Sequence, residues 1–286
     1  MTSLHGRVAL VTGAGRGLGR EMARWFAEAG ASVVICARTP GGIDALAAEL
    51  ETQGTEVLAA TCDVADPDDV EQLVHAALAR FGRIDIAVAN AAVLGPVGPI
   101  GDLDPREIAH TLTVNVAGVA ALVRSVVAPM AAQGFGRILT MSGGGVGGPG
   151  LPARVSAYVA SKGAVMLLTE ALALELPDGI TINSVAPGAV PTGFMDEVVQ
   201  AGPEIAGVAL FATVQATTMP DLTPLRDLVL YLVDSDAAWL TGRCLSARWD
   251  PPQALEAARV AGVTAARYRL RRIDEDLYED RSGPPA

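Results

Sequence analysis

The feature that most constrains the fold of this chain is a regular alternation of short apolar runs with longer stretches of helical period. Seven runs have the length and apolar content of buried strands, at residues 7–12, 31–37, 55–60, 83–90, 136–142, 180–187 and 243–247. Strands that are apolar throughout and are separated by helices predict a parallel sheet covered on both faces. The sequence therefore predicts an α/β doubly wound fold, whose ligands bind beyond the carboxyl ends of the strands.

One helix shows its start plainly, within residues 63–82. Asp66 is placed to cap the free backbone amides, and Pro67 suits the first helical position. The apolar face expected for this helix consists of Val70, Leu73, Val74, Ala77 and Leu78. This spacing predicts a helix that begins at Pro67.

The length of 286 residues, half of them apolar, is enough for one domain with a large core. We expect that domain to span residues 1–250, because the character of the chain changes after this point. Residues 251–286 form a C-terminal extension, with a basic cluster followed by an acidic one. Leu270, Ile273 and Leu277 fall on one helical face, so we expect the extension to be partly helical with a frayed end.

Charge and composition exclude several classes of function. The net charge of −11 argues against general nucleic-acid binding, which requires a basic surface. No run of 18 uncharged apolar residues and no cleavable-signal pattern is present, so we expect a cytoplasmic protein without a membrane partner. Cys36, Cys62 and Cys244 lack metal-ligand spacing, which predicts reduced buried thiols and no metal site.

A glycine-rich turn, VTGAGRGLGR at residues 11–20, follows the first strand directly and leads into a helical stretch. Gly13, Gly17 and Gly19 remove side chains where the backbone must turn sharply and approach a pyrophosphate. The pyrophosphate would then lie at the positive end of the helix. A strand before the turn and a helix after it make a dinucleotide site the favoured interpretation.

The end of the second strand indicates which dinucleotide is bound. A carboxylate there would bind a free ribose 2′-hydroxyl, whereas a cation would accept a 2′-phosphate. The sequence has Arg38 and no acid at this point, and Arg16 within the glycine-rich turn can add a second guanidinium. The alternative is that both are solvated surface arginines. We predict NADP(H) as the cofactor.

An ordered series of motifs resembles the short-chain dehydrogenase/reductase family from about residue 5 to 247. The motifs are TGAGRGLG at 12–19, CDV at 62–64, NAA at 90–92, NVAG at 115–118, YVASK at 158–162 and PGAVPT at 187–192. The resemblance implies a single-domain Rossmann-type sheet of about seven strands. Together with the arguments above, it implies cofactor contacts from Gly13, Arg16, Gly17, Leu18, Gly19, Arg38, Asp63, Val64, Asn90, Ala91, Ala92, Tyr158, Lys162, Pro187, Gly188, Val190 and Thr192.

Tyr158 and Lys162 are four residues apart, hence one turn apart on the same helix face. An ammonium group beside the phenol, with the positive nicotinamide, is expected to lower the tyrosine pKa from near 10. Tyr158 is then the general acid for ketone reduction or the base for alcohol oxidation. The resemblance implies that Lys162 also binds the ribose hydroxyls and that Asn115 holds a water linking the lysine to solvent.

A carbonyl-binding serine is usual in the family, and its place here is occupied by glycine. Counting from the fifth strand, Ser142 matches the first of a serine pair and Gly143 the second, whereas counting 13 residues back from Tyr158 reaches Gly145. Three alternatives remain open. The Ser142 hydroxyl reaches the substrate carbonyl from a shifted loop, backbone amides of residues 143–145 or a water replace it, or catalysis is lost and the protein is an NADP(H)-binding sensor or scaffold.

The segment at residues 193–224 is apolar and contains no basic residue. It predicts a lid over a hydrophobic ketone or secondary alcohol, although a helix packed on the body of the domain would have the same pattern. The lack of basic residues counts against phosphorylated or acyl-carrier-bound substrates. The resemblance implies a homotetramer or homodimer formed through the helices of residues 115–118 and 158–162 and the last strand. We expect the extension either to cross onto a neighbouring subunit or to close the active site.

Overall fold

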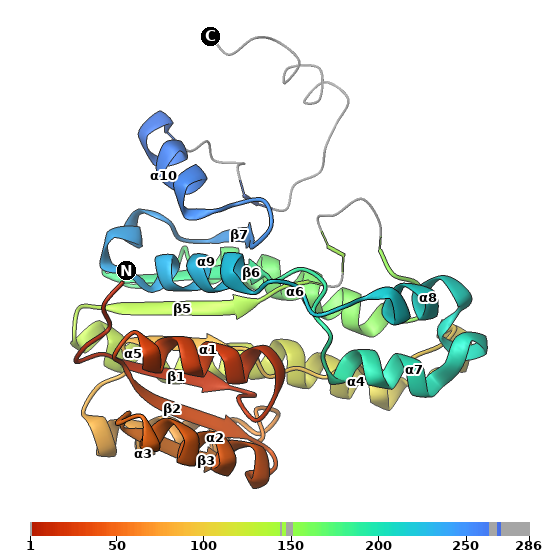
Figure 1. The fold of residues 1–286 in the computed structure, drawn as a ribbon, viewed down its shortest axis with the longest axis horizontal. Helices are drawn as coiled ribbons and strands as arrows, with labels where there is room; N and C mark the ends of the chain where they lie inside the picture. Colours follow the sequence, from red (N-terminus) through yellow and green to blue (C-terminus); the bar gives the residue numbers. More distant parts are fainter. Residues whose placement is uncertain (1, 144, 147–150, 263–267, 270–286) are drawn as a thin grey trace.

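A computed structural model describes residues 2–143, 145–146, 151–262 and 268–269. Its centre is a parallel sheet of seven strands in the order β3-β2-β1-β4-β5-β6-β7 (Figure 1). The strands are β1 (Val8–Thr12), β2 (Ser32–Ala37), β3 (Val57–Thr61), β4 (Ile86–Ala89), β5 (Gly136–Met141), β6 (Ile180–Ala186) and β7 (Arg243–Ser246). Each lies within or next to a predicted run, so the predicted single-domain α/β fold is confirmed.

Helices cover both faces of the sheet, because successive strand side chains alternate between two apolar layers. Ala9 and Val11 belong to the layer under α1 (Gly17–Glu28), α2 (Pro40–Thr52), α9 (Thr223–Val233) and α10 (Pro252–Ala261). Val8 and Leu10 belong to the layer under α3 (Pro67–Phe81), α5 (Gly118–Ala132) and α6 (Ser156–Leu172). Two buried layers explain why the strands carry no polar alternation in the sequence.

The helix predicted from Asp66 is α3. The Asp66 side chain accepts a hydrogen bond from the Asp68 amide at 2.9 Å, and Pro67 is its first residue. Gly82 ends the helix in the left-handed conformation at φ 72°, which glycine adopts without strain. Four of the predicted apolar residues are buried and Leu78 is half-buried, so the prediction of the apolar face is confirmed.

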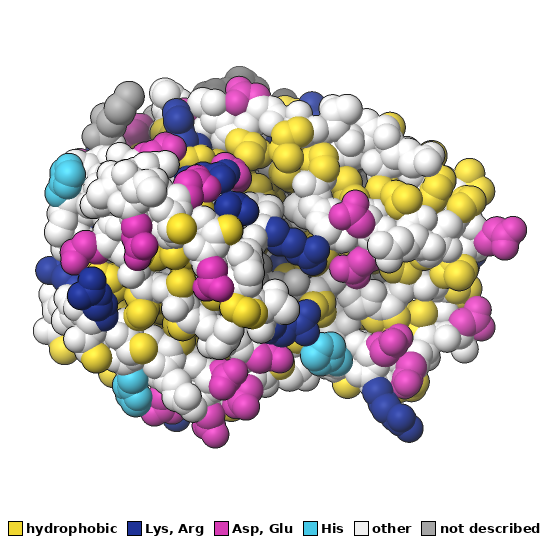
Figure 2. All heavy atoms as spheres, turned by 60° about the horizontal axis from the view of Figure 1, so that its bottom comes forward, with side chains coloured by type: hydrophobic (Ala, Val, Ile, Leu, Met, Phe, Trp, Pro, Cys, Tyr) yellow, Lys and Arg dark blue, Asp and Glu magenta, His cyan; other side chains and the backbone are white. Residues whose placement is uncertain are grey.

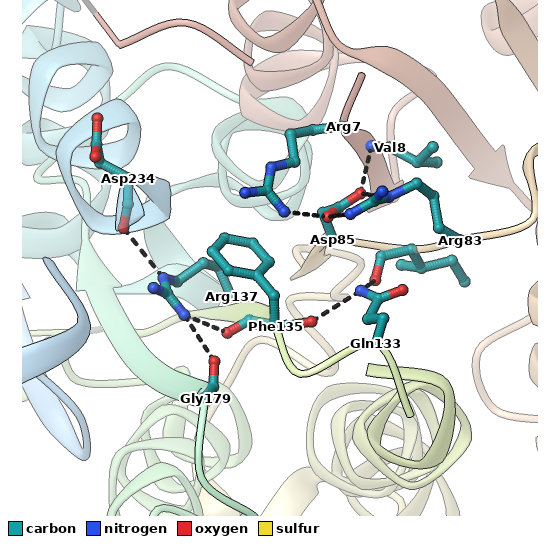
Figure 3. A network of polar contacts seen from close by, with 11 residues as sticks. Arg7, Val8, Arg83, Asp85, Gln133, Phe135, Arg137, Gly179 and Asp234 are labelled. Atoms are coloured by element: carbon teal, nitrogen blue, oxygen red, sulfur yellow. Dashed lines mark hydrogen bonds and ion pairs between the residues drawn. The ribbon is translucent and has the colours of Figure 1, made fainter. Parts of the chain in front are cut away.

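A polar network ties the amino ends of the strands together, at the edge of the sheet opposite the carboxyl ends (Figure 3). The buried Asp85 carboxylate accepts hydrogen bonds from Arg7 and Arg83, at 2.7 and 2.6 Å, and from the Val8 amide. Arg137 donates to the backbone carbonyls of Gly179 and Asp234. The network joins the starts of β1, β4 and β5, so it positions strands whose other ends carry the candidate site.

Helix α4 (Pro105–Leu112) continues through a π-helical turn (Thr113–Ala117) into α5. The combined stretch Pro105–Ala132 is long and apolar enough to cross a membrane by length and composition alone. In this fold α5 instead packs against α3, β4 and β5, as the core helix of a globular domain does. Its apolar character is therefore explained by burial within the domain.

Helices α7 (Gly193–Ala206) and α8 (Val208–Ala216) lie beyond the carboxyl ends of the strands. Figure 2 shows hydrophobic side chains gathered toward this end of the molecule. Val199, Ile205 and Val208 are among the exposed ones. The two helices form the segment that the sequence predicts as a lid.

Beyond α10, two described residues of the extension contact the domain. The Tyr268 carbonyl accepts a hydrogen bond from the Cys244 amide of β7 at 2.7 Å, and Arg269 forms an ion pair with Glu170 of α6 at 3.5 Å. The first part of the extension is helix α10. The helix expected through Leu270, Ile273 and Leu277 lies outside the described residues, so that expectation stays a prediction.

Candidate active site

A cleft of about 530 Å³ opens at the carboxyl ends of the strands. Every predicted cofactor-binding residue except Gly19 lines it. Ser142 also lines it, whereas Asn115 does not. The lining residues that the sequence analysis did not name include Thr39, Gly42, Val93 and Val114. The crevice beyond the sheet's carboxyl edge is where doubly wound folds bind ligands, so the position was predictable although these four residues were not.

Glycines shape the floor of the cleft. At Gly13, which has φ 67°, an added Cβ would lie 2.8 Å from the Ala91 backbone. Gly19 lies behind the turn, where any Cβ would collide with the Gly13 carbonyl. Gly17, at φ 56°, would direct a Cβ toward Thr192, 3.6 Å away across the cleft. The turn therefore leaves a backbone-lined cradle that fits the pyrophosphate of a dinucleotide.

Asn90 holds the turn in place from the neighbouring strand β4. Its side-chain amide donates to the Thr12 carbonyl at 2.9 Å, and its backbone amide donates to the Thr12 hydroxyl at 3.0 Å. Ala91 donates to the same hydroxyl at 3.1 Å. These bonds fix the ends of β1 and β4 beside each other, which keeps the cradle open.

The two candidate phosphate-binding arginines lie on different sides of the cleft. Arg38 follows β2 and lines the cleft beside Ala37 and Thr39. The Arg16 guanidinium instead lies against Gly193, the first residue of α7, where an added Cβ would collide with it. Arg16 also faces Glu197: burial raises the pKa of that carboxyl, and the nearby Arg16 charge opposes the rise. Arg38 is thus the guanidinium at the end of β2, while Arg16 faces the lid.

Tyr158 and Lys162 lie one turn apart on α6, as predicted from their spacing. The Lys162 ammonium is buried, donates to the Met141 carbonyl at 2.8 Å and lies 5.6 Å from the centre of the Tyr158 ring. Burial lowers the pKa of Lys162 to about 8 and raises the pKa of Tyr158 to about 12. In the protein without cofactor, desolvation thus raises the tyrosine pKa. The expected lowering involves the positive nicotinamide beside the phenol and stays a prediction.

Asn115 occupies the π-helical turn between α4 and α5. Its side chain accepts from the Val93 amide at 2.8 Å and donates to the Val93 carbonyl and to the Ser161 hydroxyl, both at 2.9 Å. Ser161 in turn donates to the Tyr158 carbonyl at 2.7 Å. Asn115 thus links Val93, in the wall of the cleft, to α6 through Ser161. Its side chain is directed toward these partners and does not line the cleft.

The residues at the end of β5 bear on the serine alternatives, which stay predictions. The Ser142 hydroxyl lies 3.5 Å from the Cys244 sulfur of β7, and Ser142 is only 4% exposed. At Gly143 an added Cβ would lie 3.9 Å from the Tyr158 hydroxyl. Gly143 therefore occupies the place opposite the tyrosine, while Ser142 is directed toward the adjacent strands. Of the remaining loop residues, 144 and 147–150 lie outside the described part of the chain.

An apolar cluster forms the outer part of the site. The Tyr158 and Phe194 rings meet edge to face, with centroids 5.5 Å apart. The buried members of the cluster are Leu94, Val155, Val198, Ala206 and Val214, and its half-buried members include Tyr158, Phe194, Met195 and Leu210. Both lid helices contribute to it. The arrangement matches a hydrophobic surface beside the predicted proton donor.

Two features of the site were not found in the sequence. Cys36 and Cys62 meet at the carboxyl ends of β2 and β3, although they are far apart in the chain; their hydrogen bond raises the pKa of Cys36 and lowers that of Cys62. Both are buried free thiols, as predicted, whereas Cys244 is a free thiol that is only half-buried. The second feature is Arg154, just before α6, whose left-handed backbone (φ 67°) has no sequence signal. Among the described residues, no three His, Cys, Asp or Glu side chains gather to hold a metal ion.

Comparison with known proteins decides the family. The family model of the short chain dehydrogenases matches residues 7–202. The chain belongs to the short-chain dehydrogenase/reductase family. As a member, it resembles Oxidoreductase UcpA of Escherichia coli, with 34% identity over 250 residues that cover 85% of this chain and 93% of the relative. This short-chain dehydrogenase/reductase is an oxidoreductase acting on CH–OH and C=O groups.

Solved structures of the family have the same fold but differ in cofactor. NAD⁺-bound xylitol dehydrogenase matches with a TM-score of 0.75 and 29% identity, covering 85% of this chain and 98% of the other. A variant of actinorhodin polyketide ketoreductase with NADPH matches with a TM-score of 0.75 and 30% identity, covering 86% and 97%. The family relation thus establishes a nicotinamide cofactor without deciding between NAD(H) and NADP(H).

Proposed function

We propose that this protein is an NADP(H)-dependent oxidoreductase that interconverts an apolar ketone and its secondary alcohol, with Tyr158 as general acid and base. The observation that carries the proposal is the placement of Tyr158 and Lys162 at the wall of the glycine-floored cleft. Arg38 at the end of β2, with no acid beside it in sequence, favours a 2′-phosphate over a free hydroxyl. The nicotinamide, when bound, supplies or accepts the hydride.

The residues of the cleft have three further roles: binding the cofactor, donating the proton and stabilising the phenolate. Gly13, Gly17 and Thr192 border the cradle for the pyrophosphate, and Asn90 fixes its shape. Tyr158, with a pKa of about 12 in the protein without cofactor, holds its proton at neutral pH and is suited to donate it to a developing alkoxide. Lys162 holds a positive charge near the phenol, which stabilises the phenolate left behind.

The donor that polarises the carbonyl is proposed to be the backbone amide at Gly143 or a water beside it. This alternative is supported by the glycine opposite the Tyr158 hydroxyl and by the contact of Ser142 with Cys244. Removing one such hydrogen-bond donor typically costs about a hundred- to a thousandfold in kcat. An enzyme without the serine hydroxyl is thus expected to be slow but active.

Comparing the two cofactors tests the NADP(H) assignment. We expect a lower KM for NADPH than for NADH when cofactor oxidation is followed over a panel of apolar ketones and aldehydes. Arg38→Asp is expected to raise the KM for NADPH by about tenfold or more, because a charge-assisted bond to the phosphate is lost. It is expected to lower the KM for NADH, because a carboxylate there can bind the free ribose 2′-hydroxyl. A wild type that prefers NADH would contradict the assignment.

The pH dependence of reduction provides a second test, of Lys162. Its lowered pKa means that the ammonium is present below about pH 8 and is lost above it. We therefore expect kcat/KM for ketone reduction to fall above about pH 8, approaching tenfold per pH unit. In Lys162→Arg the charge persists to much higher pH, so the alkaline limb should disappear even if the rate is lower. The same limb in both proteins would contradict this role of Lys162.

A second candidate function, a sensor or scaffold that binds NADP(H) without turnover, is favoured by one observation. Gly143 stands opposite the Tyr158 hydroxyl, where a serine would supply a hydrogen bond. Tight NADPH binding by the wild type with no cofactor oxidation over the whole carbonyl panel would establish it. Any turnover that depends on Tyr158 would exclude it.

A further inference from the structure

We propose that Arg154 binds a carboxylate of the substrate, and that the substrate is a carbonyl or hydroxy compound with an apolar body and one acidic group. This inference rests on the proposed function and adds a substrate class to it. Three observations carry it: the fixed position of Arg154, its uncompensated charge, and the apolar surface beside it.

The backbone of Arg154 is held in an unusual conformation between three parts of the site. Its φ of 67° is uncommon for a residue with a side chain and costs about 1 kcal/mol or more. Its carbonyl accepts a hydrogen bond from the Gly98 amide at 2.8 Å. The next residue, Val155, is buried in the apolar cluster with Tyr158. Strain of this kind is retained where the surroundings require one orientation.

The Arg154 side chain lies against Gly207, where α7 ends and α8 begins. An added Cβ on Gly207 would lie 3.5 Å from Cγ and 3.9 Å from Nε of Arg154. The preceding residue, Ala206, is fully buried in the same apolar cluster. The positions of Cγ and Nε place the Arg154 side chain at the junction of the two lid helices, next to the cluster and outside the set of residues that line the cofactor cleft.

The charge of Arg154 is not neutralised within the part of the chain that the structure describes. The side chain is half-buried, yet it forms no ion pair or side-chain hydrogen bond with a described residue. The acids of α7 do not supply one: Glu197 faces Arg16, and Asp196 and Glu204 are exposed without an ion pair to it. Partly buried guanidinium groups are ordinarily paired, because leaving one unpaired costs free energy.

The chemistry next to Arg154 defines the ligand. The apolar cluster beside Arg154 includes Leu94, Val155, Val198 and Phe194, which favours an apolar body for the ligand. A guanidinium offers a planar fork that matches a carboxylate with two parallel bonds. Residues 193–224 add no basic residue beside Arg154, and Arg16 lies against Gly193 and faces Glu197, so a single carboxylate suits Arg154 better than a doubly charged phosphate.

Comparing an acidic substrate with its uncharged ester distinguishes recognition of the carboxylate by Arg154 from a change in overall activity. We expect 4-oxocyclohexanecarboxylate to be reduced with NADPH, and its methyl ester to serve as the uncharged partner of the same shape. In Arg154→Met the ratio of kcat/KM for the acid to that for the ester should fall about ten- to a hundredfold, mainly through the KM of the acid. Arg154→Lys should retain part of the ratio, and Arg124→Met, a change of an exposed arginine on α5, should retain all of it.

Two further measurements keep the result decisive. Arg154→Gly accepts the positive φ without strain and removes the guanidinium, so it should fold and lose the ratio as Arg154→Met does. Titration calorimetry of cyclohexanecarboxylate into the NADPH complex should show binding that both variants lose. An unchanged ratio in Arg154→Met, or no carboxylate binding by the wild type, would overturn the inference. Binding that depends on Arg154 without turnover would uphold this site and reject the proposed function.

Discussion

Tyr158→Phe is expected to lower kcat for NADPH-dependent ketone reduction by about a hundred- to ten-thousandfold, the usual contribution of a positioned general acid. The substitution removes the hydroxyl and leaves the ring. The edge-to-face contact with Phe194 and the position of Lys162 are therefore preserved. The measurement is single-turnover oxidation of NADPH with an excess of ketone, which isolates the chemical step from product release.

Two controls make this result specific. NADPH binding, followed by its fluorescence, should change little in Tyr158→Phe, because the cradle is built by backbone at Gly13 and Gly17. Ser142→Ala should leave turnover nearly intact, since the Ser142 hydroxyl lies beside Cys244. A Tyr158→Phe variant with near wild-type kcat would refute the assigned role of the tyrosine. A large loss in Ser142→Ala would instead restore the alternative in which that hydroxyl reaches the substrate.

Asp85→Asn is expected to destabilise the fold by about 3 kcal/mol. The fully buried carboxylate pairs with Arg7 and Arg83 (Figure 3), whose side chains are partly exposed. The substitution removes the charge-assisted bonds and leaves buried polar atoms without a matching partner. The introduced carboxamide would retain an oxygen for the Val8 amide but no charge for the arginines. In a domain of this size the loss corresponds to a fall in Tm on the order of 10 °C, measurable by calorimetry or circular dichroism.

Two controls test this account of Asp85: the stability of the wild type at low pH, and a substitution in an exposed ion pair. Burial raises the pKa of this carboxyl, but bonds from Arg83, Arg7 and the Val8 amide more than offset the rise and leave the pKa lowered. The stabilisation is therefore present above about pH 4 and is lost as pH falls through the lowered pKa. Asp227→Asn, at an exposed pair with Arg226, should leave Tm unchanged. Equal Tm values for the Asp85 and Asp227 variants would contradict the account.

The fold was predictable because its signals are local. Uniformly apolar strands, the Asp66 cap and the glycine-rich turn each depend on a few neighbouring residues, and the sheet follows from their order. The approach of Tyr158 to Lys162 was predictable for the same reason, since one helical turn joins them.

The rest of the site depends on contacts between distant segments. Ser142 meets Cys244 only because the sheet separates β7 from β5 by one strand, and Arg16 meets Gly193 only because α7 begins near the turn after β1. The raised pKa of Tyr158 reflects burial by the lid, which spacing along α6 does not reveal. Arg154 gave no signal because a left-handed arginine is specified by its surroundings.

The π-helical turn at Thr113–Ala117 orients Asn115 at the expense of the regularity of its helix. Such a turn contains one more residue than the α-helical turn it replaces, and it is rare, occurring mostly as a single turn within α-helices. Deleting one residue would return the helix to regular form, but it would also rotate Asn115 by about 100° relative to Val93 and Ser161, given 3.6 residues per turn. The local irregularity is thus what keeps the Asn115 side chain facing Ser161 of α6. Substitutions that regularise this helix are expected to strengthen it while loosening the support of the candidate active site.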